Sequence, residues 1–116
     1  MHDAGGGSGW RRWITGAAVG AALGFLVPVA FGQDSALVAK GKQAFNDQGC
    51  YGCHTLGRSG TPIAPDLSRI GAKRSEEYLR RWLEDPEAQK PTAHMPKLAL
   101  TKEEARALAA YLASFR

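Results

Sequence analysis

The sequence has few residues of the kinds that build sheets or bind nucleic acid. Of its 116 residues only two are cysteine and two are methionine, one of them the first residue. No stretch alternates apolar and polar side chains as an exposed strand does, and β-branched residues are sparse after Val38. No basic run occurs, because the basic residues between Arg69 and Arg74 are followed at once by Glu76 and Glu77. These absences argue against a β-fold and against nucleic acid as a partner.

The N-terminal segment has the pattern of an export signal. Arg11 and Arg12 precede eighteen uncharged residues, 14–31. A positive patch before an apolar run keeps the N-terminus in the cytoplasm and sends the following chain across the membrane. We therefore expect the rest of the protein to be periplasmic or otherwise extracytoplasmic.

Two outcomes are open for this segment. Ala30 and Gly32 have the small side chains and the spacing that a signal peptidase reads, which favours cleavage. The apolar run is also just long enough to remain as an uncleaved helix that associates with the membrane. We expect residues 1–32 to be a signal peptide or a membrane anchor, and residues 33–116 to form one domain.

That domain is expected to be all-α, with three main helices. Ser35 is a candidate cap for a first helix over 35–48, in which Gly41 suggests close approach of another helix. Ser75 begins a second helix that ends before Pro86. A capping box begins the third helix at Thr101. Two irregular stretches, 56–71 and 86–100, separate these helices, and so small a domain needs a non-polypeptide group around which they fold.

The two cysteines indicate the chemical nature of this non-polypeptide group. They lie at Cys50 and Cys53, and His54 follows directly. On a helical turn, positions i, i+3 and i+4 face the same way, so both thiols can reach one porphyrin while the imidazole points at its iron. C-x-x-C-H is the attachment signature of c-type haem, in which the histidine becomes an axial ligand.

Three other uses of these residues fit less well. A thioredoxin-type dithiol needs a βαβ surrounding. A structural zinc site needs four ligands, and besides the three motif residues only His94 is at hand. A disulfide between Cys50 and Cys53 would close too small a loop to add much stability. We therefore expect one haem c with its iron, attached through both cysteines.

Met95 is the candidate for the second axial ligand. It is the only methionine after the first residue, and it lies in a proline-containing loop where a side chain can be directed inward. A thioether opposite histidine raises the reduction potential and completes the coordination of the iron. The neighbouring His94 is the alternative ligand, because imidazole also binds iron.

Residues 35–116 resemble the class I monohaem cytochromes c. The resemblance rests on Gly41 and Phe45, the motif 50–54, the segment 64–67, Met95-Pro96 and the helix from Thr101. It implies the small cytochrome c fold, with helices and loops wrapped around one haem. It further implies that the Pro65 carbonyl accepts a hydrogen bond from His54, that Leu67 packs on the haem face and that Trp82 lies beside the haem. The groups that hold the propionates stay open among Tyr78, Trp82, Arg69 and Arg74.

These features predict a one-electron carrier rather than an enzyme. With His54 and Met95 on the iron, no position is left for a substrate. The partners would be redox proteins, for which the mild positive charge of the chain and four rim residues are candidate contacts: Arg58, Lys73, Lys90 and Lys97. Two alternatives are a haem enzyme or sensor whose methionine ligand dissociates, and an anchored cytochrome subunit of a larger oxidoreductase complex.

Overall fold

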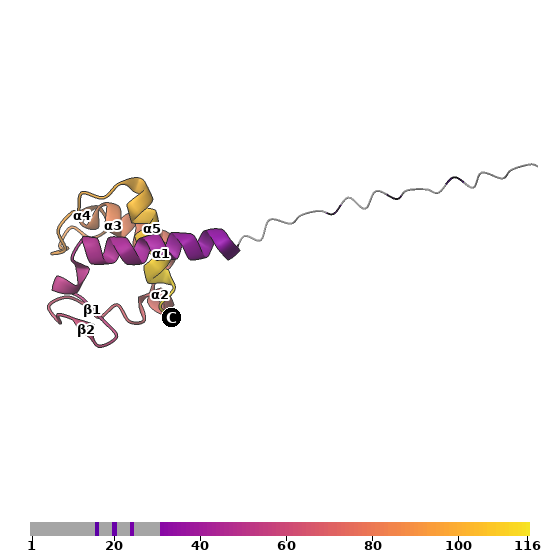
Figure 1. Cartoon of the computed structure of the whole chain (residues 1–116). Coiled ribbons are helices and arrows are strands. Elements are labelled where there is room, and N and C mark those ends of the chain that lie inside the picture. Colours follow the sequence, from indigo (N-terminus) through magenta and orange to yellow (C-terminus); the bar gives the residue numbers. More distant parts are fainter. Residues whose placement is uncertain (1–15, 17–19, 21–23, 25–30) are drawn as a thin grey trace, which may run out of the picture.

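The computed structural model describes residues 31–116 and, before them, residues 16, 20 and 24 alone. Five α-helices, one short 3₁₀ helix and two short strands follow one another along the chain (Figure 1). In order they are α1 (Phe31–Asp47), η1 (Cys50–Gly52), β1 (Thr55–Leu56), β2 (Ser59–Gly60), α2 (Ile70–Lys73), α3 (Glu76–Glu84), α4 (Pro86–Gln89) and α5 (Lys102–Ala113). The expected all-α class is therefore confirmed, with α1, α3 and α5 as its main helices.

The crossing of α1 and α5 is the centre of the fold (Figure 1). Gly41 makes it possible, because a Cβ atom there would overlap the Ala107 carbonyl oxygen and lie 2.6 Å from the Tyr111 Cβ. The prediction that another helix approaches Gly41 is thus confirmed. Because glycine has no side chain, the two helix backbones can come closer here than they could at any other residue.

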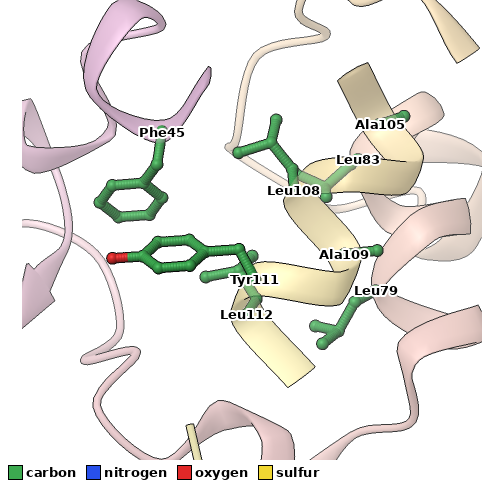
Figure 2. Packing of buried hydrophobic residues seen from close by; sticks show 8 residues of the cluster. All are labelled: Phe45, Leu79, Leu83, Ala105, Leu108, Ala109, Tyr111 and Leu112. Carbon is green, nitrogen blue, oxygen red and sulfur yellow. The ribbon is translucent and has the colours of Figure 1, made fainter. Parts of the chain in front are cut away.

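The buried cluster comes from α1, α3 and α5. Figure 2 shows Phe45 of α1 facing Tyr111 of α5. Their ring centroids are 5.7 Å apart, and the rings pack edge to face. Such an arrangement suits the quadrupoles of two aromatic rings. Around this pair lie Leu79, Leu83, Ala105, Leu108, Ala109 and Leu112. The apolar stripes of three helices therefore meet in one core.

The helix starts follow the capping residues, with one exception. Ser75 Oγ accepts from the Tyr78 amide at 3.1 Å, and Thr101 forms a complete capping box with Glu104. The prediction for Ser35 was wrong: α1 begins at Phe31, so Ser35 lies inside the helix. A capping residue permits a helix start but does not require one when the preceding residues also adopt helical geometry.

The stretches expected to be irregular contain short elements of their own. Asp85 caps α4 by accepting from the Ala88 amide, and Pro86 occupies the first turn, where its missing N–H costs nothing. The other stretch contains the β1–β2 hairpin, which pairs Thr55 with Gly60 and Leu56 with Ser59. No strand was expected here, because two-residue strands are too short to show an alternating pattern.

The expected export segment lies outside the described residues, apart from 16, 20 and 24. The expected domain boundary after residue 32 falls in the first turn of α1. Within the described part of the chain, no helix combines the length and the hydropathy needed to cross a membrane.

Candidate haem site

The cysteine and histidine motif forms one tight turn after α1. Gly49 enters it with φ at 70°, a left-handed conformation that glycine adopts without strain. The Cys50 carbonyl accepts hydrogen bonds from the amides of Cys53, at 3.2 Å, and His54, at 2.9 Å. The expected helical turn is therefore present, and it places both thiols and the imidazole on a single short piece of backbone.

Both thiols in this turn are free, and they differ in exposure. Cys50 is half-buried, whereas Cys53 is exposed. Burial raises the pKa of the Cys50 thiol, against a smaller lowering by a backbone hydrogen bond, and the neighbouring Cys53 raises it further. A reactive dithiol of the thioredoxin kind needs a lowered thiol pKa. The environment of Cys50 thus argues against that alternative.

The ring of His54 is oriented by Pro65. Its Nδ1 atom lies 2.7 Å from the Pro65 carbonyl oxygen. A carbonyl oxygen can only accept, so Nδ1 carries the proton, and the lone pair of this imidazole is on Nε2. Histidines that bind metals commonly have this arrangement, because the bond to the other nitrogen fixes the ring and strengthens it as a donor.

The chain after Pro65 is held against the motif by backbone hydrogen bonds. The Ala64 amide donates to the Cys53 carbonyl at 2.7 Å, and the Leu67 amide donates to the Thr55 carbonyl at 2.9 Å. Leu67 is half-buried and packs against the main hydrophobic cluster. The structure therefore places the motif residues Cys50, Cys53 and His54 beside the segment that contains Pro65 and Leu67, the two residues that the family resemblance had pointed to.

Met95 and Trp82 form a second group. The Trp82 indole Nε1 donates a hydrogen bond to the Met95 Sδ at 3.2 Å. Met95 is half-buried and packs against the main cluster, whereas His94 is exposed. Of the two candidate ligands in this loop, the methionine is therefore the one that faces the interior. In Figure 1, α3, which carries Trp82, and the β1–β2 hairpin after His54 lie on opposite sides of α1.

The four candidates for the propionates are not equivalent. The Trp82 indole N–H already donates its hydrogen bond to the Met95 sulfur, so it is not available for a propionate. The Arg74 guanidinium lies over the Tyr78 ring, 4.7 Å from its centroid, a cation–π contact that places both residues at one spot. Arg69 is exposed at the start of α2. Arg74 and Tyr78 thus act as a pair, a relation that the sequence did not indicate.

Two features near His54 were missed at the level of sequence. Gly60 has φ at 103°, and a Cβ atom there would overlap the His54 carbonyl oxygen. The Asp66 carboxylate accepts hydrogen bonds from Thr55 and Ser68. The spacing Asp-x-Ser is a common turn signal and could have indicated the second feature.

The residues present fit a haem c. In the described residues no group of three or more His, Cys, Asp or Glu side chains is arranged to hold a bare metal ion. The candidate donors are the half-buried His54 imidazole and the half-buried Met95 thioether, the set expected when a porphyrin supplies the other ligands. Half-buried apolar side chains from several elements border the core: Leu56, Leu67, Ile70, Tyr78, Met95 and Leu100.

Comparison with known proteins identifies the family. Residues 38–116 match the family described as Cytochrome c. The chain belongs to the cytochrome c family. The family implies a covalent haem c with its iron and a role in electron transfer, to which the free cysteines of the motif correspond.

Several relatives belong to larger complexes. Cytochrome c oxidase subunit 2 of Alkalihalophilus pseudofirmus is 32% identical over 89 residues, covering 69% of this chain and 26% of the relative. A subunit of the nitric oxide reductase of Paracoccus denitrificans is 32% identical over 84 residues, covering 65% of this chain and 56% of the relative. The chain thus spans about a quarter and about half of the lengths of these relatives.

A solved structure supports the fold. The c-type cytochrome SorU from Sinorhizobium meliloti superposes with a TM-score of 0.56 at 24% identity, over 70% of this chain and 92% of that one. At this identity the likeness shows the common architecture alone.

Proposed function

We propose that this cytochrome c domain carries single electrons on one haem, attached through Cys50 and Cys53, with His54 and Met95 as axial ligands. The observation that carries the proposal is the pair of oriented donors: Nδ1 of His54 is committed to Pro65, and Met95 faces inward with its sulfur held by Trp82. Both arrangements leave one lone pair of a good iron ligand available.

The bound haem would supply an iron that takes one electron from a reduced donor, becoming ferrous, and returns it to an oxidised acceptor, becoming ferric. The chain contributes the setting. Cys50 and Cys53 would tether the ring, Pro65 would orient His54, Leu67 would pack on the haem, and Trp82 would lie beside it and orient Met95. If His54 and Met95 both held the iron, substrates would have no access to it, so the chain would act as a carrier and not as an enzyme by itself.

The contact with redox partners would form around Cys53. This cysteine is exposed, and the Ile63 amide donates to its carbonyl at 3.2 Å. Ile63 is the exposed large hydrophobic residue of the described part of the chain, at 74% exposure. Residues 51–74 also carry four basic side chains against one acidic side chain, Asp66. An exposed apolar side chain in a segment of net positive charge suits a brief encounter with an acidic partner.

Of the four rim lysines and arginines expected from the sequence, one is paired. The Lys97 ammonium lies 3.5 Å from the Asp85 carboxylate, while Arg58, Lys73 and Lys90 are exposed. An exposed ion pair of this length contributes little stability. It does reduce the positive charge around Lys97, so Arg58, Lys73 and Lys90 are the better candidates for partner contact.

The relatives favour a second candidate, in which the chain is a cytochrome subunit of an oxidoreductase complex. Two of them are subunits of an oxidase and of a nitric oxide reductase. Residues 14–31 would then remain as a membrane anchor and the domain would work outside the cytoplasm. Mass spectrometry of the mature N-terminus separates this case from a cleaved signal peptide, and salt washing of membranes separates anchored from docked protein.

The ligand assignment is tested by Met95→Ala, with His94→Ala as the matched control. We expect Met95→Ala to lower the reduction potential and to let carbon monoxide bind the ferrous protein, because the thioether is lost. His94→Ala should keep the wild-type potential and spectrum. An unchanged spectrum in Met95→Ala excludes Met95 as ligand. Carbon monoxide binding by the wild type would favour the sensor or enzyme alternative, in which the methionine is displaced.

A further inference from the structure

The Asp66 carboxylate is the centre of a hydrogen-bond network beside the haem motif. Its Oδ1 atom accepts from the Thr55 hydroxyl at 3.0 Å, from the Ser68 amide at 3.1 Å and from the Ser68 hydroxyl at 2.7 Å. The Ser68 hydroxyl in turn accepts from the Gly57 amide at 2.7 Å. We call these four residues, Thr55, Gly57, Asp66 and Ser68, the Asp66 clamp.

The clamp joins two segments of chain in one register. The contacts 53–64, 54–65, 55–66 and 57–68 all connect residues eleven positions apart. Segments 53–57 and 64–68 therefore run side by side in the same direction. The contacts 55–66 and 57–68 belong to the clamp, and the contact 54–65 is the bond from His54 to Pro65. The clamp thus lies one residue beyond that bond on both segments.

We propose that Asp66 is a positioning residue for His54: by holding Thr55 and Ser68 it fixes the register in which the Pro65 carbonyl meets the imidazole. This inference rests on the proposed role of His54 as iron ligand. The hydrogen bonds of Asp66 go to Thr55 and Ser68 and not to His54, so its effect on the imidazole passes through the placement of the backbone.

The backbone hydrogen bonds that join these segments come from Ala64 and Leu67, on either side of Pro65 and Asp66, and the clamp adds the side-chain contacts between them. Pro65 has no N–H, so its own amide cannot anchor it, and residues 61–69 form no helix or strand. A carboxylate accepts several hydrogen bonds at once, and bonds to a charged acceptor are stronger than neutral ones. The Ser68 hydroxyl and amide, then Thr55, hold the pKa of Asp66 below its ordinary value, and Lys73 adds a smaller effect in the same direction.

The readout is the solvent exchange of the His54 Nδ1 proton, followed by NMR in the ferrous holoprotein. Loss of the clamp removes the side-chain contacts beside Pro65 while the backbone bonds of Ala64 and Leu67 remain, so Pro65 is held less firmly. We therefore expect Asp66→Ala to exchange this proton about tenfold faster than the wild type. Its reduction potential should rise, because a less firmly hydrogen-bonded imidazole is a weaker donor to ferric iron. Ser68→Ala, which keeps the carboxylate but loses one donor, should show an intermediate exchange rate.

Two controls separate position from charge. Asp66→Asn keeps an acceptor oxygen of the same reach and should exchange nearly as slowly as the wild type. Asp47→Ala removes an exposed carboxylate at the end of α1 and should leave the exchange rate unchanged. The inference is overturned if the Nδ1 proton exchanges at the wild-type rate in both Asp66→Ala and Ser68→Ala. It is also overturned if this proton exchanges as fast in Asp66→Asn as in Asp66→Ala. If Asp66→Ala yields no holoprotein, Ser68→Ala decides.

Failure of the proposed function would look different. A wild-type protein without haem, or one in which His54→Ala leaves the axial ligation intact, contradicts the assignment of His54 itself. A wild-type holoprotein whose Nδ1 proton is protected, together with unchanged exchange in the clamp variants, contradicts only the role of Asp66.

Discussion

The indole N–H of Trp82 donates a hydrogen bond to the sulfur of Met95, across 3.2 Å between α3 and the loop before α5. Trp82 also stacks on Tyr78 of the same helix, with ring centroids 6.2 Å apart. A thioether sulfur has two lone pairs, so one can accept this bond while the other binds iron. The contact therefore orients the proposed ligand and withdraws electron density from it.

We predict that Trp82→Phe lowers the reduction potential of the holoprotein. Without the indole N–H, the sulfur becomes a better donor and stabilises ferric iron more strongly. Spectroelectrochemical titration measures the shift. Tyr78→Phe is the comparison variant: it keeps the stacked ring and the bond to Met95, so any shift it shows comes from the Tyr78 hydroxyl and not from the sulfur. Equal potentials in the wild type and Trp82→Phe would show that this hydrogen bond does not act on the iron.

Those parts of the fold that depend on local signals could be predicted from the sequence. Ser75 and Thr101 begin helices because their side chains accept the first free amides, and Gly41 marks a helix crossing because nothing larger fits there. The C-x-x-C-H spacing likewise identifies the attachment turn, because it is set by a single helical turn.

The parts that depend on contacts between distant residues could not be predicted. The Asp66 clamp and the bond between Trp82 and Met95 join residues eleven to thirteen positions apart in irregular backbone, which no periodicity describes. The Pro65 contact was expected only from the family resemblance. The start of α1 was misplaced because the capping residue Ser35 is followed and preceded by residues that adopt helical geometry equally well.

The proposed contact around Cys53 predicts an effect of Ile63 on partner reactions alone. Ile63→Ser should slow electron transfer to the redox partner about tenfold, because an apolar side chain buried on docking contributes about one to a few kcal/mol. Stopped-flow oxidation by a partner protein purified from the source organism measures this rate. Oxidation by ferricyanide, which needs no protein contact, and the reduction potential should both stay at wild-type values. A tenfold loss with ferricyanide as well would place the effect of Ile63 at the haem rather than at the partner.

The helix crossing predicts an inversion of the usual preference for alanine over glycine. Gly41→Ala places a methyl group against the Ala107 carbonyl oxygen, a backbone atom that can move away only by separating α1 from α5. We expect the free energy of unfolding to fall by about 2 kcal/mol, because an overpacking cost of about 3 kcal/mol outweighs the gain of about 1 kcal/mol from helix propensity. Ala39→Gly, at an exposed position of the same helix, should cost about 1 kcal/mol from propensity alone. Denaturant unfolding of both holoproteins measures the two values. If alanine proves the better residue at position 41 as well, the two helices do not approach as closely in solution as the fold requires.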